Sequence, residues 1–248
     1  IRDSVASRGL GDVYKRQVLM VSVKISEIFE SIQGEGTNAG KDAIFLRTAE
    51  CNLRCTWCDT KYTWDWKNYN YDKEVKEISI NDIKQILEKS SIRHLVITGG
   101  EPLMQQDDLV ELVTFLKPEF YVEVETNGTI LPNNELTTLV DQWNVSPKTK
   151  NSGNPEKLCE DNDCYVFFSR QKNCYFKYVI EDENDLTEIK NLINKYDLDR
   201  NKVFLMPQAI TKPEIISREK IVTKMAKDSK LSYSPRMHVS MWGNQRGK

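Results

Sequence analysis

Three cysteines, Cys51, Cys55 and Cys58, lie within eight residues in the segment CNLRCTWC. Cysteine thiolates are ligands for zinc and for iron-sulfur clusters, and both kinds of centre normally take four protein ligands. No histidine lies nearby in the sequence to complete the set. The spacing therefore predicts a metal centre with one open coordination position. A zinc loop that takes a distant fourth ligand, or three ordinary buried thiols, would give the same local sequence.

A second motif, TGGEP at residues 98–102, directly follows an apolar run at 94–98. Glycines let the backbone approach a ligand closely, and the carboxylate of Glu101 could accept from an ammonium group. A plain turn between a strand and a helix would have a similar composition. The combination of CxxxCxxC with GGEP resembles the radical S-adenosylmethionine superfamily. This resemblance implies a 4Fe-4S cluster on the three cysteines, whose open iron binds S-adenosylmethionine before it is cleaved to a 5'-deoxyadenosyl radical.

The elements that must position these motifs alternate between strand and helix patterns. Four segments have the apolar period of amphipathic helices, at 79–89, 107–116, 186–196 and 217–227. Short apolar or alternating runs predict strands at 21–29, 43–46, 94–98, 120–124, 143–145, 175–180, 203–206 and 237–241. Such alternation predicts a mainly parallel sheet with the functional residues at the carboxyl ends of its strands. We expect an α/β fold, a partial and open TIM-like (β/α) barrel of the radical S-adenosylmethionine type.

Length and charge restrict the class of protein further. The 248 residues fit a single α/β domain, which we place at residues 20–248, with residues 1–19 as a non-native or disordered leader. The 35 basic and 37 acidic residues are interspersed, which argues against nucleic acid as a partner. No apolar run is long enough to span a membrane, and we expect a cytoplasmic protein. Six cysteines in that compartment favour metal binding or catalysis over disulfides.

Further motifs narrow the resemblance to one family. SIQGEG lies at 31–36, FLR at 45–47, CDT at 58–60, SPK at 146–148 and WGNQRG at 242–247. Together they resemble the 7-carboxy-7-deazaguanine synthase family from about Val23 to the C-terminus. Members convert 6-carboxy-5,6,7,8-tetrahydropterin into 7-carboxy-7-deazaguanine with loss of ammonia, on the route to queuosine and other 7-deazapurines. The resemblance implies Mg²⁺, a homodimer, and an electron donor such as flavodoxin or ferredoxin.

The resemblance also assigns roles to individual residues. Arg47 would hold the carboxylate of the pterin, and Thr60 would ligate Mg²⁺ through its hydroxyl oxygen. The other residues expected to contact substrate are Ile32, Gln33, Gly34 and Thr98. The residues expected to contact the cosubstrate are Trp57, Cys58, Asp59, Gly100, Glu101, Ser146, Pro147, Lys148 and Gln208. Each has an ordinary alternative as a strand-end charge, a turn residue or a solvated loop, and it is their joint order that favours function.

Two rival functions stay open at this point. An activating enzyme for a glycyl-radical protein, of the anaerobic ribonucleotide reductase type, would share the cysteine loop. A non-catalytic zinc-binding module would bind about one zinc and show no cluster absorption.

Several residues receive no firm role from the sequence. Cys159, Cys164 and Cys174 lack the tight spacing of a second cluster, so we interpret them as ordinary thiols. His94 is expected to be structural, whereas His238 could approach the pterin. Aromatic residues between 62 and 76 could form a lid over the site or a dimer contact, and they include Trp64, Trp66, Tyr69 and Tyr71.

Overall fold

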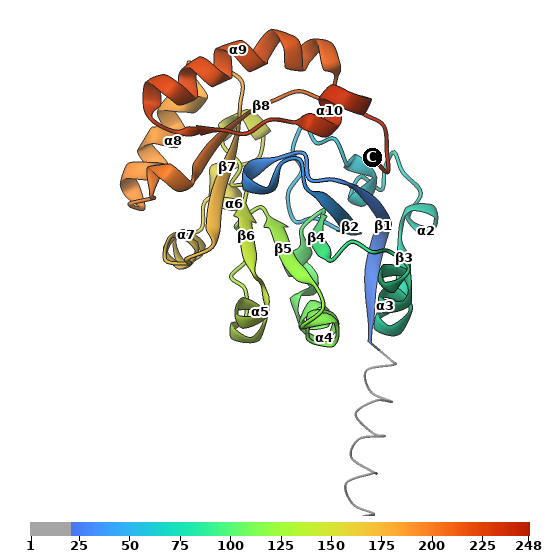
Figure 1. The fold of residues 1–248 in the computed structure, drawn as a ribbon. Coiled ribbons are helices and arrows are strands. Elements are labelled where there is room, and N and C mark those ends of the chain that lie inside the picture. Colours follow the sequence, from blue (N-terminus) through green and yellow to red (C-terminus); the bar gives the residue numbers. More distant parts are fainter. Residues whose placement is uncertain (1–20) are drawn as a thin grey trace, which may run out of the picture.

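The computed structural model describes residues 21–248, so the expected leader lies outside the described residues. A single sheet runs through the fold in the order β3-β1-β2-β4-β5-β6-β7-β8-β9 (Figure 1). Its strands are β1 Ser22–Ile32, β2 Asp42–Thr48, β3 Lys76–Ser79, β4 His94–Gly99, β5 Tyr121–Thr126, β6 Gln142–Val145, β7 Cys174–Ile180, β8 Val203–Pro207 and β9 Ser232–Tyr233.

The sheet is mainly parallel, as the alternating pattern predicts. From β2 to β9 each strand pairs in parallel with its neighbour, for example Leu46 with Ile97 and Val124 with Trp143. Only β1 is antiparallel, because it pairs with both β2 and β3 in that sense. The strand order ends at β3 and β9, so the curved sheet is an open, partial barrel.

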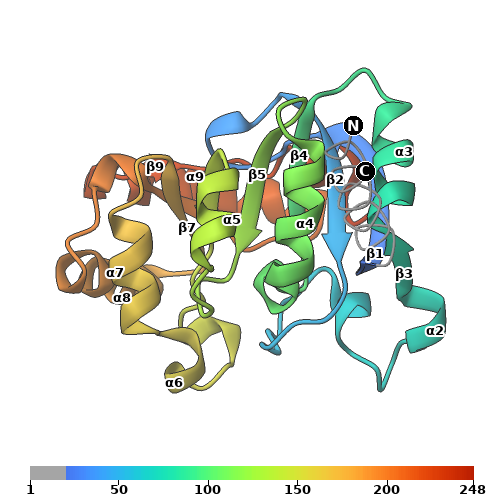
Figure 2. The same cartoon turned by 90° about the horizontal axis from the view of Figure 1, so that it is seen from below.

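Helices cover the outer face of the sheet. Figure 2 shows α4 and α5 side by side against the near face, with α3 next to them. The apolar face of α3 is buried through Ile80, Ile83 and Leu87, and Ser79 caps its first turn by accepting from the backbone N–H of Asp82. The helices are α2 Tyr71–Glu74, α3 Ile80–Glu88, α4 Gln106–Leu116, α5 Asn134–Leu139, α6 Glu156–Cys159, α7 Asn162–Ser169, α8 Glu183–Lys195, α9 Lys212–Ser229 and α10 Met237–Trp242. None of the helices in residues 21–248 is long and apolar enough to cross a bilayer.

One expected strand is wrong. Residues 237–241 alternate apolar and polar side chains but form helix α10, in which Val239 is the buried residue. The segment is held by long-range contacts that the local pattern does not contain, including a hydrogen bond from Met237 N to Gly34 O. The short elements β3, β9, α2, α5, α6 and α7 were also not expected, because each is too brief to show a clear period.

The segment between β1 and β2 lies along the concave side of the sheet. The Gln33 side chain donates to Glu123 and Glu125 on β5, and Asn38 donates to Glu123 and to Gln142 on β6. Buried polar groups are costly unless they are hydrogen-bonded, and here they pair with one another. Through these contacts the segment fills part of the barrel interior and brings the SIQGEG motif to the site.

Candidate active site

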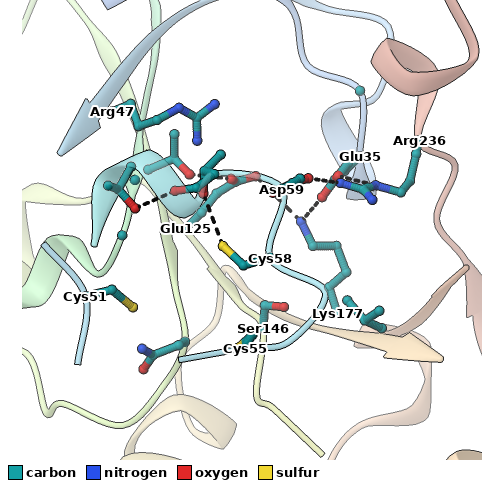
Figure 3. Close-up of a pocket in the computed structure, with 18 of the residues that line it drawn as sticks. Glu35, Arg47, Cys51, Cys55, Cys58, Asp59, Glu125, Ser146, Lys177 and Arg236 are labelled. Carbon is teal, nitrogen blue, oxygen red and sulfur yellow. Dashed lines mark hydrogen bonds and ion pairs between the residues drawn. The ribbon is translucent and has the colours of Figure 1, made fainter. Parts of the chain in front are cut away.

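Most of the motifs predicted from the sequence line one cavity (Figure 3), but residues 242–247 of the WGNQRG motif are not among its lining residues. The cysteine loop follows β2, the GGEP segment follows β4, and residues 146–148 and Gln208 follow β6 and β8. These segments come from the carboxyl ends of parallel strands, where α/β barrels place their sites. Gln33, Gly34 and Glu35 reach the same cavity from the segment that lies across the concave face.

Cys51, Cys55 and Cys58 all line the cavity, and none is in a disulfide. Two of the sulfur atoms accept from side-chain N–H groups: Asn154 Nδ2 lies 3.3 Å from Cys55 Sγ, and Trp64 Nε1 lies 3.3 Å from Cys58 Sγ. Hydrogen bonds to thiolate sulfur stabilise the negative charge and tune the potential of an iron-sulfur centre. The loop therefore presents three thiols to the cavity, with donors already aimed at two of them.

The donor set fits a 4Fe-4S cluster with one open iron. Burial raises the pKa of the Cys51 thiol to about 12, so this group is protonated until a metal displaces the proton. Within residues 21–248, no three His, Cys, Asp or Glu side chains are grouped tightly enough to hold a single metal ion. Structural zinc sites take four protein ligands, whereas three thiolates suffice for a 4Fe-4S cluster with one open iron. The set of three free thiols at the cavity therefore fits the cluster.

The glycines of the GGEP motif allow the backbone after β4 to pack directly on the cysteine loop. Gly99 has φ of 144°, and a Cβ there would overlap the backbone of Thr48. A Cβ on Gly100 would overlap the carbonyl of Glu50, the residue before Cys51. Only glycine permits this close approach, which brings the backbone of 99–100 to the cavity beside the three cysteines.

Glu101 lies behind the cavity wall and not in it. Its fully buried carboxylate accepts from Thr126 Oγ1 at 2.7 Å, from Asn127 N at 2.7 Å and from Leu103 N at 3.1 Å. Thr126 and Asn127 do line the cavity. In this structure Glu101 therefore fixes the loop after β5 and does not itself face the expected ligand.

Arg47 lies in the cavity wall with part of its guanidinium still available. Its Nε donates to Glu27 Oε1 at 2.9 Å, and its guanidinium lies over the Phe29 ring. Among residues 21–248, the hydrogen bond and ion pair of Arg47 are made through Nε and not through its two terminal nitrogens. The guanidinium is thus oriented by one carboxylate and can receive another through its remaining edge.

The other residues expected to contact substrate lie nearby. Thr98 Oγ1 donates to Glu125 Oε2 at 2.8 Å, and the Gln33 amide donates toward the same carboxylate. Ile32 and Gly34 also line the cavity. The structure therefore brings all five predicted substrate residues together, beside the acceptor Glu125 that sequence reasoning missed.

The residues expected to contact the cosubstrate or Mg²⁺ also gather here, with one further exception. The Thr60 hydroxyl lies 3.6 Å from Cys58 Sγ, and Lys148 donates to Ser146 O and Oγ while lying near the Trp57 ring. Gln208 accepts from Arg218 on α9. Pro147 is not among the residues that line the cavity, although both of its neighbours are.

Opposite the cysteine loop is a network of buried ion pairs that the sequence did not reveal. Glu35 binds Lys177 and also Arg236, whose Nε lies 3.1 Å from Glu35 Oε1 (Figure 3). Lys177 approaches Glu125 at 3.7 Å, and Arg236 also binds Asp59 at 2.5 Å. Glu35 is part of the SIQGEG motif and could have been suspected, whereas Lys177 and Arg236 have no local signal.

The charges in this network control one another's protonation. Burial alone would raise the pKa of Glu35, but Lys177 and Arg236 outweigh burial and hold the pKa far below its ordinary value. Burial lowers the pKa of His238, although its Nε2 lies 3.8 Å from Glu35. The pocket thus contains fixed charges and a histidine that stays neutral to lower pH than usual.

The three remaining cysteines lie outside the cavity lining. Cys164 and Cys174 are buried in the main apolar core. Cys159 packs with Leu53 and Cys55 beneath the cysteine loop. His94 pairs with the buried Glu123 at 2.9 Å, at the opposite end of β4 from the GGEP motif.

Comparison with known proteins agrees with this site. Residues 45–144 match the family model of the radical SAM superfamily. The fold resembles a crystal structure of QueE from Escherichia coli, with a TM-score of 0.67, 24% identity, and coverage of 90% of this chain and 96% of that one. Three free cysteines within the matched residues line a cavity of this partial barrel, as expected for a radical S-adenosylmethionine enzyme.

Full-length relatives identify the family within that class. The chain is 38% identical over 227 residues to 7-carboxy-7-deazaguanine synthase from Pyrobaculum aerophilum, a match that covers 91% of this chain and 97% of the relative. It is 31% identical to the enzyme of that name from Rhodopirellula baltica, over 91% of this chain and 89% of the relative. The chain belongs to the 7-carboxy-7-deazaguanine synthase family.

Proposed function

We propose that this chain converts 6-carboxy-5,6,7,8-tetrahydropterin into 7-carboxy-7-deazaguanine with release of ammonia. The product is the precursor of queuosine and other 7-deazapurines. The observation that carries the proposal is the placement of three free cysteines and Arg47 on the walls of one cavity. A cavity that holds both the cluster ligands and a cation for a carboxylate suits a small acidic substrate close to the site of radical formation.

Cys51, Cys55 and Cys58 would hold the 4Fe-4S cluster. When bound, this cluster supplies the electron that cleaves S-adenosylmethionine at its open iron. Gly100 would offer its backbone beside the cluster, and the space for the ribose, adenine and carboxylate would be surrounded by Trp57, Asp59, Ser146, Lys148 and Gln208. Pro147 and Glu101 lie outside the cavity lining and would support its wall. Asn154 and Trp64, whose N–H groups donate to the sulfurs of Cys55 and Cys58, would stabilise the cluster charge.

The pterin would lie between Arg47 and the cluster of Gln33, Thr98 and Glu125 side chains. The free edge of the Arg47 guanidinium would bind the carboxylate at C6, in the bidentate geometry that suits this pair. Thr98, Glu125 and Gln33 already share hydrogen bonds. Carboxylate and amide groups of this kind can pair with the N–H groups of a pterin, while Ile32 and Gly34 line the adjoining wall.

Three further features belong to the same proposal. Thr60 would contribute one hydroxyl oxygen to Mg²⁺, which completes its shell with substrate and water oxygens. An electron donor such as flavodoxin or ferredoxin would reduce the cluster, and the enzyme would act as a cytoplasmic homodimer. Neither nucleic acid nor a membrane would take part.

Turnover of the carboxypterin tests the proposal. Anaerobically reconstituted protein, given S-adenosylmethionine, Mg²⁺ and a reductant, should form a product with the ultraviolet spectrum of the carboxydeazaguanine. Cys55→Ala should lose both the brown colour and turnover, whereas Cys174→Ala, which changes a buried core thiol, should keep both. A protein that cleaves S-adenosylmethionine but leaves the carboxypterin unchanged would instead support the glycyl-radical activating function.

A further inference from the structure

Arg236 joins three segments of the site that are far apart in the sequence. Its Nε donates to Glu35 Oε1 at 3.1 Å, and Glu35 lies in the SIQGEG motif. Its Nη2 donates to Asp59 Oδ2 at 2.5 Å, next to the cluster ligand Cys58. Its Nη1 donates to the backbone carbonyl of Ala209, which follows Gln208. One side chain therefore contacts the segment expected to hold substrate, the cluster loop and a segment expected to hold cosubstrate.

The guanidinium is well suited to fix these segments relative to one another. It is planar and presents its N–H groups at fixed angles, so each nitrogen can serve a different partner only in one arrangement. The Arg236 side chain is only 10% exposed, and that of Glu35 is 12% exposed. Water therefore competes little for these contacts, which makes the arrangement stiffer than a surface ion pair.

Lys177 adds a second connection to the same carboxylate. It binds Glu35 and lies 3.7 Å from Glu125, which itself accepts from Thr98. Through Lys177, Glu35 therefore also connects Arg236 to Glu125, on the side of the cavity expected to hold substrate. A shift of the C-terminal segment would be transmitted through Arg236 to both sides of the cavity.

We propose that Arg236 is a positioning residue that sets the distance between the bound pterin and the carbon radical made from the cosubstrate. The inference rests on the proposed function and adds a role for the C-terminal segment in hydrogen transfer. Hydrogen abstraction needs the reacting atoms in near contact, and a displacement of about 1 Å can slow such a step about 100-fold. Arg236 acts through Glu35, Asp59 and Ala209.

The coupling of cosubstrate cleavage to product formation tests this role. In a coupled turnover the hydrogen returns to the cosubstrate, so 5'-deoxyadenosine does not accumulate. Holoenzyme carrying Arg236→Met should keep its cluster absorption and iron content. It should accumulate about 10- to 100-fold more 5'-deoxyadenosine per product than wild type. Arg236→Lys keeps the charge but cannot serve three partners. Its ratio of 5'-deoxyadenosine to product should therefore lie between those of wild type and Arg236→Met.

A matched comparator separates positioning from simple loss of an arginine. Among residues 21–248, Arg218 hydrogen-bonds one residue that is expected to contact a ligand, Gln208, through its backbone and side-chain oxygens. Arg218→Met should weaken binding of S-adenosylmethionine and leave the ratio of 5'-deoxyadenosine to product unchanged.

The outcomes distinguish the inference from the proposed function. A wild-type enzyme that makes no carboxydeazaguanine refutes the proposed function. If wild type turns over and both Arg236 variants keep its ratio of 5'-deoxyadenosine to product, the positioning role is wrong. The role is equally wrong if Arg236→Lys loses cluster, cosubstrate cleavage and product in equal proportion, since that result indicates a purely structural arginine.

Discussion

Glu123→Gln is expected to destabilise the protein by about 4 kcal/mol, because the Glu123 carboxylate is fully buried and receives four donors. Gln33 Nε2 and Asn144 Nδ2 lie 2.7 and 2.5 Å from Oε1. Asn38 Nδ2 and His94 Nε2 lie 2.6 and 2.9 Å from Oε2. These contacts join the segment after β1 to the concave face of the sheet, so the substitution probes the interior on which the site rests.

The magnitude follows from the change in donors and acceptors. The substitution places an amide NH₂ where one carboxylate oxygen stood. If that nitrogen takes the position of Oε2, His94 can accept through its other tautomeric state, but the amide of Asn38 faces a second donor. An unpaired buried donor costs about 1–3 kcal/mol. Three bonds that change from charge-assisted to neutral lose together about 2 kcal/mol more.

Urea unfolding of the metal-free protein under anaerobic conditions measures this difference. Glu119→Gln is a suitable control, because that side chain is 51% exposed and its change should stay below about 0.5 kcal/mol. Glu123→Gln should also raise the KM for the pterin, since the hydrogen bond that holds Gln33 becomes neutral and weaker. A difference in unfolding free energy below about 1 kcal/mol would refute the four-donor arrangement.

Three other predictions concern the site itself. Arg47→Gln should raise the KM for the carboxypterin by about 10- to 100-fold, since a charge-assisted bond contributes about 1.5–3 kcal/mol, while cosubstrate cleavage without pterin stays at the wild-type rate. Trp64→Phe removes an N–H···S bond and should make the cluster potential more negative in redox titration, and an unchanged potential would contradict this. Glu35 has a pKa held below 4.5 by Lys177 and Arg236 against the effect of burial, so its contribution to stability is complete above that pH and is lost as the pH falls further. Glu35→Gln should therefore flatten the dependence of unfolding free energy on pH below about 4.5, and a parallel curve would oppose it.

Much of the fold could be predicted because its signals are local. Buried parallel strands such as β4 and β7 appear as short apolar runs, and α3 shows both a helical period and a capping serine. The strand expected at 237–241 failed for the opposite reason. Its alternation is only five residues long, and the contacts of Arg236 and Met237 with distant segments decide its conformation.

The residues of the site likewise divide into those with a local signal in the sequence and those without one. The cysteine motif and the GGEP motif could be found because each lies within a few residues, one along a loop and the other at a strand end. The pairing of Lys177 with Glu35 spans 142 positions, and that of Arg236 with Glu35 spans 201. No local pattern records such a contact. The interior position of Glu101 was also missed, since spacing gives the location of a carboxylate but not the direction in which it points.

The central claim is that Cys51, Cys55 and Cys58 hold a 4Fe-4S cluster with one iron left open for S-adenosylmethionine. Electron paramagnetic resonance of the reduced, reconstituted protein tests it most directly, with cosubstrate labelled by ¹⁷O in its carboxylate. We predict about four irons per chain, a spectrum that changes on addition of the cosubstrate, and hyperfine coupling from the label to the cluster. A spectrum that does not respond to the cosubstrate, or a fourth protein ligand on that iron, would contradict the account.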